Sequence, residues 1–141
     1  GAAELQAALR RLVTDLQHPP LEPQGWSAHL ARRAGDYIRR HYHRRLTLEE
    51  LARETDLSPT YFCALFKREW GIGFRRFLQE VRLAEARRLL SEPGHTVEAV
   101  ANAVGFEDVH YFTRVFRRVV GVPPGEYRRR RQQEAYREPE E

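Results

Sequence analysis

The sequence has few of the residues that support redox chemistry, disulfides or membrane insertion. Its 141 residues include one cysteine, Cys63, and no methionine, which excludes an internal disulfide and a cysteine-rich zinc site. Apolar residues make up 41% of the chain, but they never run on for the roughly 20 positions that a bilayer span needs. These absences predict a cytoplasmic protein that folds by packing alone and makes no contact with a membrane.

Lysine is almost missing, although the chain is basic. Lys and Arg total 24 against 20 acidic residues, the pI is about 9.6, and Lys67 is the single lysine. Guanidinium groups suit phosphate oxygens and guanine edges, and an excess of positive charge favours a polyanionic partner. A GC-rich genome that favours arginine codons would produce the same composition, so charge alone leaves both explanations open.

The sequence shows no spacing of residues that is typical of a catalytic site or a metal site. The six histidines have no regular metal-ligand spacing, and the acidic residues are scattered along the chain. The sequence contains no phosphate-binding glycine loop and no nucleophile with a recognisable base. We therefore predict that the protein is not an enzyme and that it holds no cofactor and no metal.

The two ends of the chain differ in composition from its middle. The chain starts at Gly1 without a methionine, so we expect it to be a fragment that lacks an N-terminal domain. Leucines from Leu5 to Leu16 line one helical stripe, and a proline-rich stretch follows. We predict three segments: an amphipathic helix and linker at 1–25, a folded domain at 26–130, and a charged, flexible tail at 131–141.

From Trp26 onward the hydrophobic pattern is helical, and no stretch alternates with period two. Proline and glycine fall only where helices can begin or end, so the fold class is all-α with about seven helices. Expected helix starts are Trp26, Thr47, Ser58, Phe74, Thr96, Asp108 and Pro123. The longest helix should run from Phe74 to Leu90, and the last should end near Tyr127. On the longest helix we expect Phe77, Leu78, Val81, Ala84, Leu89 and Leu90 to face inward.

One pattern occurs twice in the predicted domain. Thr47–Ala52 matches Thr96–Ala101, and Tyr61–Arg68 matches Tyr111–Arg118. Each copy is a short helix, a tight turn and a longer helix, which is the arrangement of a helix-turn-helix unit. The sequence therefore predicts two tandem helix-turn-helix units joined by the long helix.

Each turn requires a residue that tolerates the left-handed conformation. Gly105 supplies it in the second unit without steric cost, and Asp56 occupies the matching place in the first. Ala52 and Ala101 stand where the two helices of a unit must approach closely.

Further residues stand at positions typical of one protein family. In the second unit they are Ala101, Gly105, Phe106, Tyr111, Phe112, Arg114, Phe116, Gly121, Pro123, Pro124 and Tyr127. In the first they are Ser58, Pro59, Tyr61, Phe62, Leu65, Phe66, Lys67 and Gly71. With these residues, roughly residues 28–130 resemble the DNA-binding domain of the AraC/XylS family.

The resemblance implies a sequence-specific transcription regulator, commonly an activator that contacts RNA polymerase, with double-stranded DNA as its partner. Reader helices would lie near 59–70 and 108–120, with the helix from Phe74 to Leu90 as spacer. A spacer of about 17 residues is about 26 Å long, so it can hold two readers near the roughly 34 Å between successive major grooves. A sensor or dimerisation domain would precede the linker, and a homodimer would form through that domain or the helix at 5–16.

The inward positions of each reader helix are apolar, which leaves the opposite face for DNA. Arg114 stands at a family position that often touches bases, and a bidentate contact with guanine would contribute about 1–3 kcal/mol of discrimination. Ala64 replaces the longer polar side chain that the family usually has, so apolar or shape-based readout is expected in the first unit. The predicted base contacts are Thr60, Cys63, Ala64, Val109, His110, Thr113 and Arg114. The predicted phosphate contacts are Lys67, Arg68, Arg75, Arg76, Arg117, Arg118, Arg128 and Arg129. About half of them should touch DNA, because a surface arginine is by default solvated.

Two other interpretations stay open. Tandem helix pairs with aromatic stripes also build protein-interaction modules, and a salt-sensitive, sequence-selective complex with DNA would distinguish the two functions. A DNA-repair alkyltransferase with a similar helical region would use Cys63 as acceptor, although one cysteine and no zinc-ligand cluster argue against it. A methyl-transfer assay tests that activity.

Overall fold

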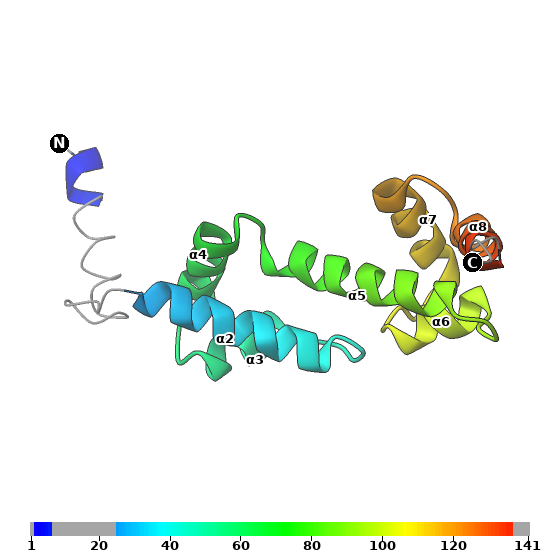
Figure 1. Ribbon diagram of the computed structural model, residues 1–141. Helices are drawn as coiled ribbons and strands as arrows, with labels where there is room; N and C mark the ends of the chain where they lie inside the picture. The colour runs from blue at the N-terminus through cyan, green and yellow to red at the C-terminus, as the bar shows by residue number, and fades with distance from the viewer. Residues whose placement is uncertain (1, 7–24, 137–141) are drawn as a thin grey trace. The chain divides into compact units, whose positions relative to one another are not determined.

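The computed structural model describes residues 2–6 and 25–136, and in this part of the chain every regular element is helical. Residues 2–6 are helical, whereas most of the predicted amphipathic helix at 5–16 lies outside the described residues. The helices after residue 25 are α2 (Trp26–His41), α3 (Leu48–Glu54), α4 (Pro59–Trp70), α5 (Phe74–Ser91), α6 (Val97–Ala103), α7 (Val109–Val120) and α8 (Pro124–Tyr136) (Figure 1). The predicted all-α class is confirmed, with seven helices in the predicted folded part. None of the described helices has the length and apolar character of a bilayer span.

Side-chain caps fix where four of these helices begin. Thr47, Ser58 and Thr96 each accept a hydrogen bond from the backbone N–H three residues on, at 3.1–3.2 Å. Asp108 accepts one from the N–H of His110 at 2.8 Å. Such caps satisfy amides that have no partner inside the helix, each contributing about 1 kcal/mol. The short helix and the longer helix of each repeat therefore start where the sequence predicts.

The two turns of the repeat have the same hydrogen-bond geometry. The N–H of Leu57 donates to the carbonyl of Ala52 at 3.0 Å, and the N–H of Phe106 donates to that of Ala101 at 2.9 Å. The residue just before the donor is left-handed in both turns, with φ of 55° at Asp56 and 102° at Gly105. The predicted equivalence of the two turns is confirmed.

The described helices form two compact units, divided within α5. In the described part of the chain, the first contains residues 25–40 and Leu46–Phe77. Its core includes Leu30, Ile38, Leu51, Phe62, Leu65, Phe66, Phe74 and Phe77. Trp70 at the end of α4 closes this core, and its indole N–H donates to the carbonyl of Ala31 at 2.9 Å. Gly35 allows the indole to lie against α2, since a Cβ there would be 2.7 Å from Trp70 Cζ2.

The second unit contains residues 41–45, most of α5, and α6 to α8. Its core consists of Leu83, Ala86, Leu90, Val100, Ala101, Val104, Phe106, Phe112, Val115 and Phe116. The predicted inward stripe of α5 is wrong in part, because Ala84 is exposed while Leu83 and Ala86 are buried. The reason is that the buried residues of α5 belong to two separate cores and do not form one continuous stripe.

Arg82 on α5 joins three segments of the second unit. Its Nε donates to the carbonyl of Tyr42 at 2.8 Å and its Nη2 to that of Arg44 at 2.9 Å. Its guanidinium lies 5.8 Å from the centre of the Phe106 ring. Partial burial lowers the pKa of Arg82 below its usual range. The turn residue Gly105 fits beside this group because it has no side chain: a Cβ there would lie 2.9 Å from Arg82 Nε.

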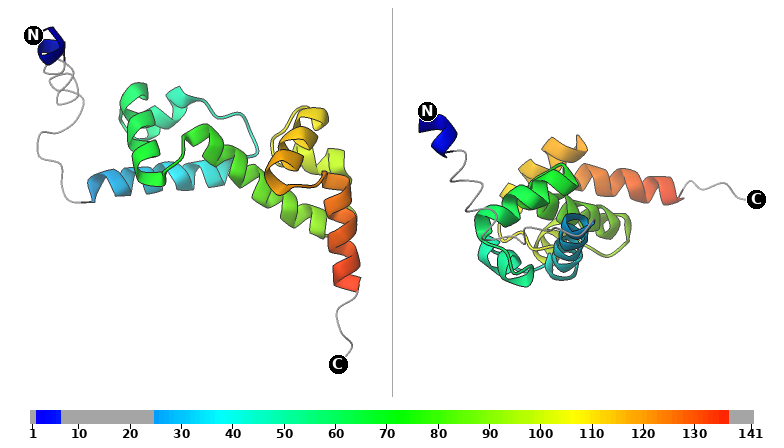
Figure 2. Two further views of the ribbon diagram at one scale, coloured as in Figure 1. Left: turned by 90° about the horizontal axis from the view of Figure 1, so that it is seen from above. Right: turned by 90° about the vertical axis from the view of Figure 1, so that its left-hand side faces the viewer.

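The last helix is longer than the sequence indicates. A flexible tail was expected from position 131, but α8 continues to Tyr136 (orange to red in Figure 2). Arg130 pairs with Glu126 at 2.5 Å and Arg131 with Glu134 at 3.1 Å, and such pairs stabilise a helix by about 0.2–0.5 kcal/mol each. The prediction is therefore wrong for 131–136, and 137–141 lie outside the described residues.

A first prediction concerns the contact between Gly35 and Trp70. Gly35→Ala should lower the free energy of unfolding by about 1 kcal/mol, because overpacking costs about 1–3 kcal/mol and exceeds the gain in helix propensity of about 1 kcal/mol. Urea unfolding followed by tryptophan fluorescence measures the change. The control is Gly125→Ala on α8, where a Cβ meets nothing within 4 Å, so stability should be unchanged or higher. Equal stabilisation by both substitutions would contradict the prediction.

A second prediction concerns Arg82. Arg82→Ala should destabilise the second unit by about 2 kcal/mol, since two backbone carbonyls lose a charged donor. Arg87→Ala is the matched control: Arg87 is an exposed arginine on the same helix, and its loss should change stability by less than about 0.5 kcal/mol. Thermal unfolding by circular dichroism compares the two. Similar unfolding midpoints for both variants would show that the Arg82 contacts contribute little.

Candidate nucleic-acid interface

On α4, one face is buried and the other lies in solvent. Phe62, Leu65 and Phe66 are fully buried. The opposite face presents Thr60, Ala64 and Lys67, all exposed and spaced by four and three residues, so they follow one another along the helix. Cys63, also a predicted base contact, is half-buried at the edge of this face.

The corresponding face of α7 is more polar and more basic. His110, Arg114 and Arg117 are exposed and equivalent to Thr60, Ala64 and Lys67 of α4, fifty positions earlier. The helix contains no acidic residue. Its buried face consists of Phe112, Val115 and Phe116.

Two other predicted base contacts of α7 are partly engaged with the protein itself. Val109 packs against the core of the second unit and is half-buried. Thr113 is also half-buried, and its hydroxyl donates to the carbonyl of Val109 at 2.8 Å. The hydroxyl oxygen of Thr113 keeps its acceptor capacity, whereas its hydrogen is already used. His110 and Arg114 therefore present the more available polar groups of this face.

Arg114 lies against an aromatic ring. Its guanidinium carbon is 5.9 Å from the centre of the Tyr111 ring, one turn earlier on α7. Tyr111 is 45% exposed. From the sequence, Tyr111 was identified only as part of the repeat and the family pattern, although its spacing of three residues from Arg114 could have indicated the contact.

The predicted phosphate contacts fall into three groups. Lys67, Arg117, Arg118 and Arg129 are exposed. By contrast, Arg68 donates to the hydroxyl of Ser27 at 2.7 Å, and Arg128 donates to the carbonyl of His95 at 2.9 Å. These two side chains connect elements within their own units, so they have less freedom to reach a ligand. Arg75 lies over the ring of Phe74 at 5.1 Å, and Arg76 is exposed beside it at the start of α5.

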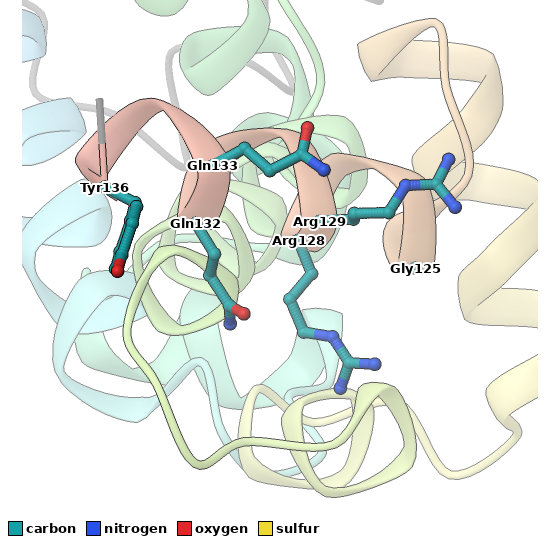
Figure 3. Close-up of a pocket in the computed structure, with 6 residues that line it drawn as sticks. All are labelled: Gly125, Arg128, Arg129, Gln132, Gln133 and Tyr136. Atoms are coloured by element: carbon teal, nitrogen blue, oxygen red, sulfur yellow. The ribbon is translucent and has the colours of Figure 1, made fainter.

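An open groove runs along α8. Figure 3 shows its lining side chains, which are Arg128, Arg129, Gln132, Gln133 and Tyr136, with Gly125 at one end. Cations and amides of this kind suit an anionic group such as a phosphate. Among the described residues, no three potential ligand side chains come together in a way that could hold a metal ion.

Comparison with known proteins assigns the domain. The family model described as "Helix-turn-helix domain" matches residues 51–130. The HTH-type transcriptional regulator YijO of Escherichia coli strain K12 is 37% identical over 123 residues, which cover 87% of this chain and 44% of that protein. The chain spans less than half the length of the curated relatives that it matches.

Two solved structures share the fold. One is a probable AraC family transcriptional regulator from Rhodopseudomonas palustris, with a TM-score of 0.68 and 30% identity over 74% of this chain and 98% of that chain. The other is the DNA-binding domain of AdpA in complex with a target DNA, with a TM-score of 0.72 and 25% identity over 77% and 97% of the two chains. The two helix-turn-helix units, the match to the family model and these structures together place the chain in the AraC/XylS family of transcription regulators.

Proposed function

We propose that this chain binds double-stranded DNA at specific sequences and, as part of a longer protein, regulates transcription. α4 and α7 are the reader helices. The observation that carries the proposal is the exposed face of α7, where His110, Arg114 and Arg117 stand opposite a fully buried apolar face. A helix that is packed against the core on one side and basic on the other can bind in a major groove. Its cations can bind phosphates, and a guanidinium can recognise guanine.

The family assignment argues against the alternatives considered from sequence. The family consists of transcription regulators and not of enzymes, which agrees with the prediction of no enzyme activity. The AdpA domain that shares this fold was solved on DNA. These relatives support DNA as the partner, in preference to the two alternatives, a protein-interaction module and a DNA-repair alkyltransferase.

Within this proposal the two units read DNA differently. In the second, Arg114 makes the base contact that discriminates most, with His110 and Thr113 beside it. In the first, Thr60 and Ala64 offer a hydroxyl, a methyl group and no long donor, so contacts with thymine methyl groups and DNA shape dominate. The second half-site should therefore tolerate fewer base changes than the first.

We rank the phosphate contacts by the exposure of each residue and by its contacts within its own unit. Lys67, Arg117, Arg118 and Arg129 are assigned as the main phosphate contacts, because their charged groups lie in solvent. Arg75 and Arg76, at the first turns of α5, contribute next. Arg68 and Arg128 act mainly by holding their units together, through Ser27 and the His95 carbonyl.

The finer parts of the proposal concern the whole protein. It acts in the cytoplasm as an activator, contacts RNA polymerase, and forms a homodimer through residues 5–16 or a preceding domain. The support is the family resemblance and the length of the relatives, because the matched part of this chain covers less than half of each of them. The two readers engage successive major grooves, and the support for this is the repeat of the helix-turn-helix unit together with the family assignment.

Selection of bound duplexes from a random pool, followed by hydroxyl-radical footprinting on the selected site, tests the function. The expected result is a sequence-selective complex with two protected segments about 10 base pairs apart. Protection confined to one turn of DNA would refute the two-groove arrangement. Binding that ignores both base sequence and ionic strength, or no binding, would favour a protein-interaction module.

The salt dependence of binding tests the assigned phosphate contacts. Arg118→Ala should weaken binding to all sequences alike and reduce the slope of log K against log salt by about 0.9. Arg130→Ala is the control, because Arg130 is an exposed arginine already paired with Glu126, and the slope should not change. Fluorescence anisotropy at several salt concentrations measures both slopes. An unchanged slope for Arg118→Ala would remove this residue from the interface.

A further inference from the structure

Tyr111 is an aromatic side chain that is anchored on one side and exposed on the other. Its ring centre lies 6.1 Å from that of Phe106, the turn residue, which in turn lies 5.1 Å from Phe112 in the core. Phe106 and Phe112 are buried, whereas Tyr111 is 45% exposed. The ring is therefore fixed by the core of its unit and offers a free surface beside the exposed face of α7.

The guanidinium of Arg114 lies over the ring of Tyr111. Its central carbon lies 5.9 Å from the centre of the Tyr111 ring, within the range of a cation–π interaction, which contributes about 0.5–1 kcal/mol at exposed sites. A free arginine side chain carries about 2 kcal/mol of rotamer entropy that is lost when it binds in one geometry. A contact that restricts the guanidinium beforehand removes part of this loss and favours the two parallel hydrogen bonds needed for guanine.

The repeat provides an internal comparison. Tyr61 holds the place of Tyr111 in the first unit, but the residue three positions on is Ala64, which has no charge to stack. The aromatic position is thus present in both units, and the cation in one. An effect that depends on the pair should appear only in the half-site read by α7.

We propose that Tyr111 is a positioning residue that fixes the guanidinium of Arg114 for base recognition, and that it thereby sets the sequence specificity of the second unit. This inference rests on the proposed function, in which Arg114 contacts a base. Tyr111 acts through Arg114 and needs no contact of its own with DNA. Its ring and not its hydroxyl carries the effect, because the stacking surface is the aromatic face.

The test measures binding of the full chain to the selected duplex and to all its single base-pair substitutions. Arg114→Ala identifies the base pair that Arg114 reads. Tyr111→Leu should reduce discrimination at that base pair by about two- to fivefold, the equivalent of one exposed cation–π contact. Tyr111→Phe should keep the discrimination, and Tyr61→Leu should leave that base pair unaffected. In the Arg114→Ala background, Tyr111→Leu should cause no further loss of discrimination.

Thermal unfolding of each variant shows whether the domain is intact, and Tyr111→Gln provides a second test if the leucine variant does not fold. An equal loss of affinity for all duplexes, with discrimination unchanged in either variant, would overturn the inference. So would a loss of discrimination in Tyr111→Phe. If Arg114→Ala changed no base preference at all, the proposed role of Arg114 would fail first, and the role of Tyr111 with it.

Discussion

The proposed reader helices α4 and α7 must each bury one face in the core of their own unit and leave the other face in solvent. The remaining features of the site depend on this constraint. Phe62 and Phe66 in α4, and Phe112 and Phe116 in α7, have no exposed surface. Burying one such side chain contributes about 1.5–3 kcal/mol, whereas an exposed ion pair contributes about 0–1 kcal/mol. Core packing therefore fixes the rotation of each helix about its axis. The exposed residues can differ between units without altering the scaffold.

The two turns of the repeat have the same hydrogen bond but differ in the space around their residue of positive φ. Both turns close with a hydrogen bond to an alanine carbonyl, at Ala52 and Ala101. The first tolerates Asp56 at positive φ, but the second is crowded, because Arg82 and the Tyr42 carbonyl lie within 3 Å of the place where a Cβ would stand at Gly105. Glycine is thus required there for space as well as for backbone conformation. The turn of the second unit is held by residues from distant parts of the sequence.

Local sequence pattern was sufficient to predict where the helices begin, but it did not predict the contacts between them. Periodicity, caps and turn residues located the helix starts and the two units, since these signals lie within a few residues of one another. The bond from Arg82 to Tyr42 spans 40 positions, and nothing in the local sequence indicates it. The same holds for Arg68, predicted as a phosphate contact but bonded to Ser27. The extension of α8 was missed for another reason: its charges suggested a solvated tail, although they pair along the helix.

Because the helix-turn-helix unit occurs twice, two properties of the proposed interface can be compared between the units: affinity for the phosphate backbone and discrimination between bases. The pair Lys67 and Arg117 keeps a cation at the same helical position in both units, so both can hold the phosphate backbone, which supplies affinity for any sequence. Ala64 and Arg114 are also equivalent positions, but they differ in side chain. Of the two, only the arginine can make a bidentate contact with guanine, which discriminates by about 1–3 kcal/mol. Affinity can therefore be shared between the units while specificity is concentrated in one. A chain of this design can bind half-sites of unequal stringency with one scaffold.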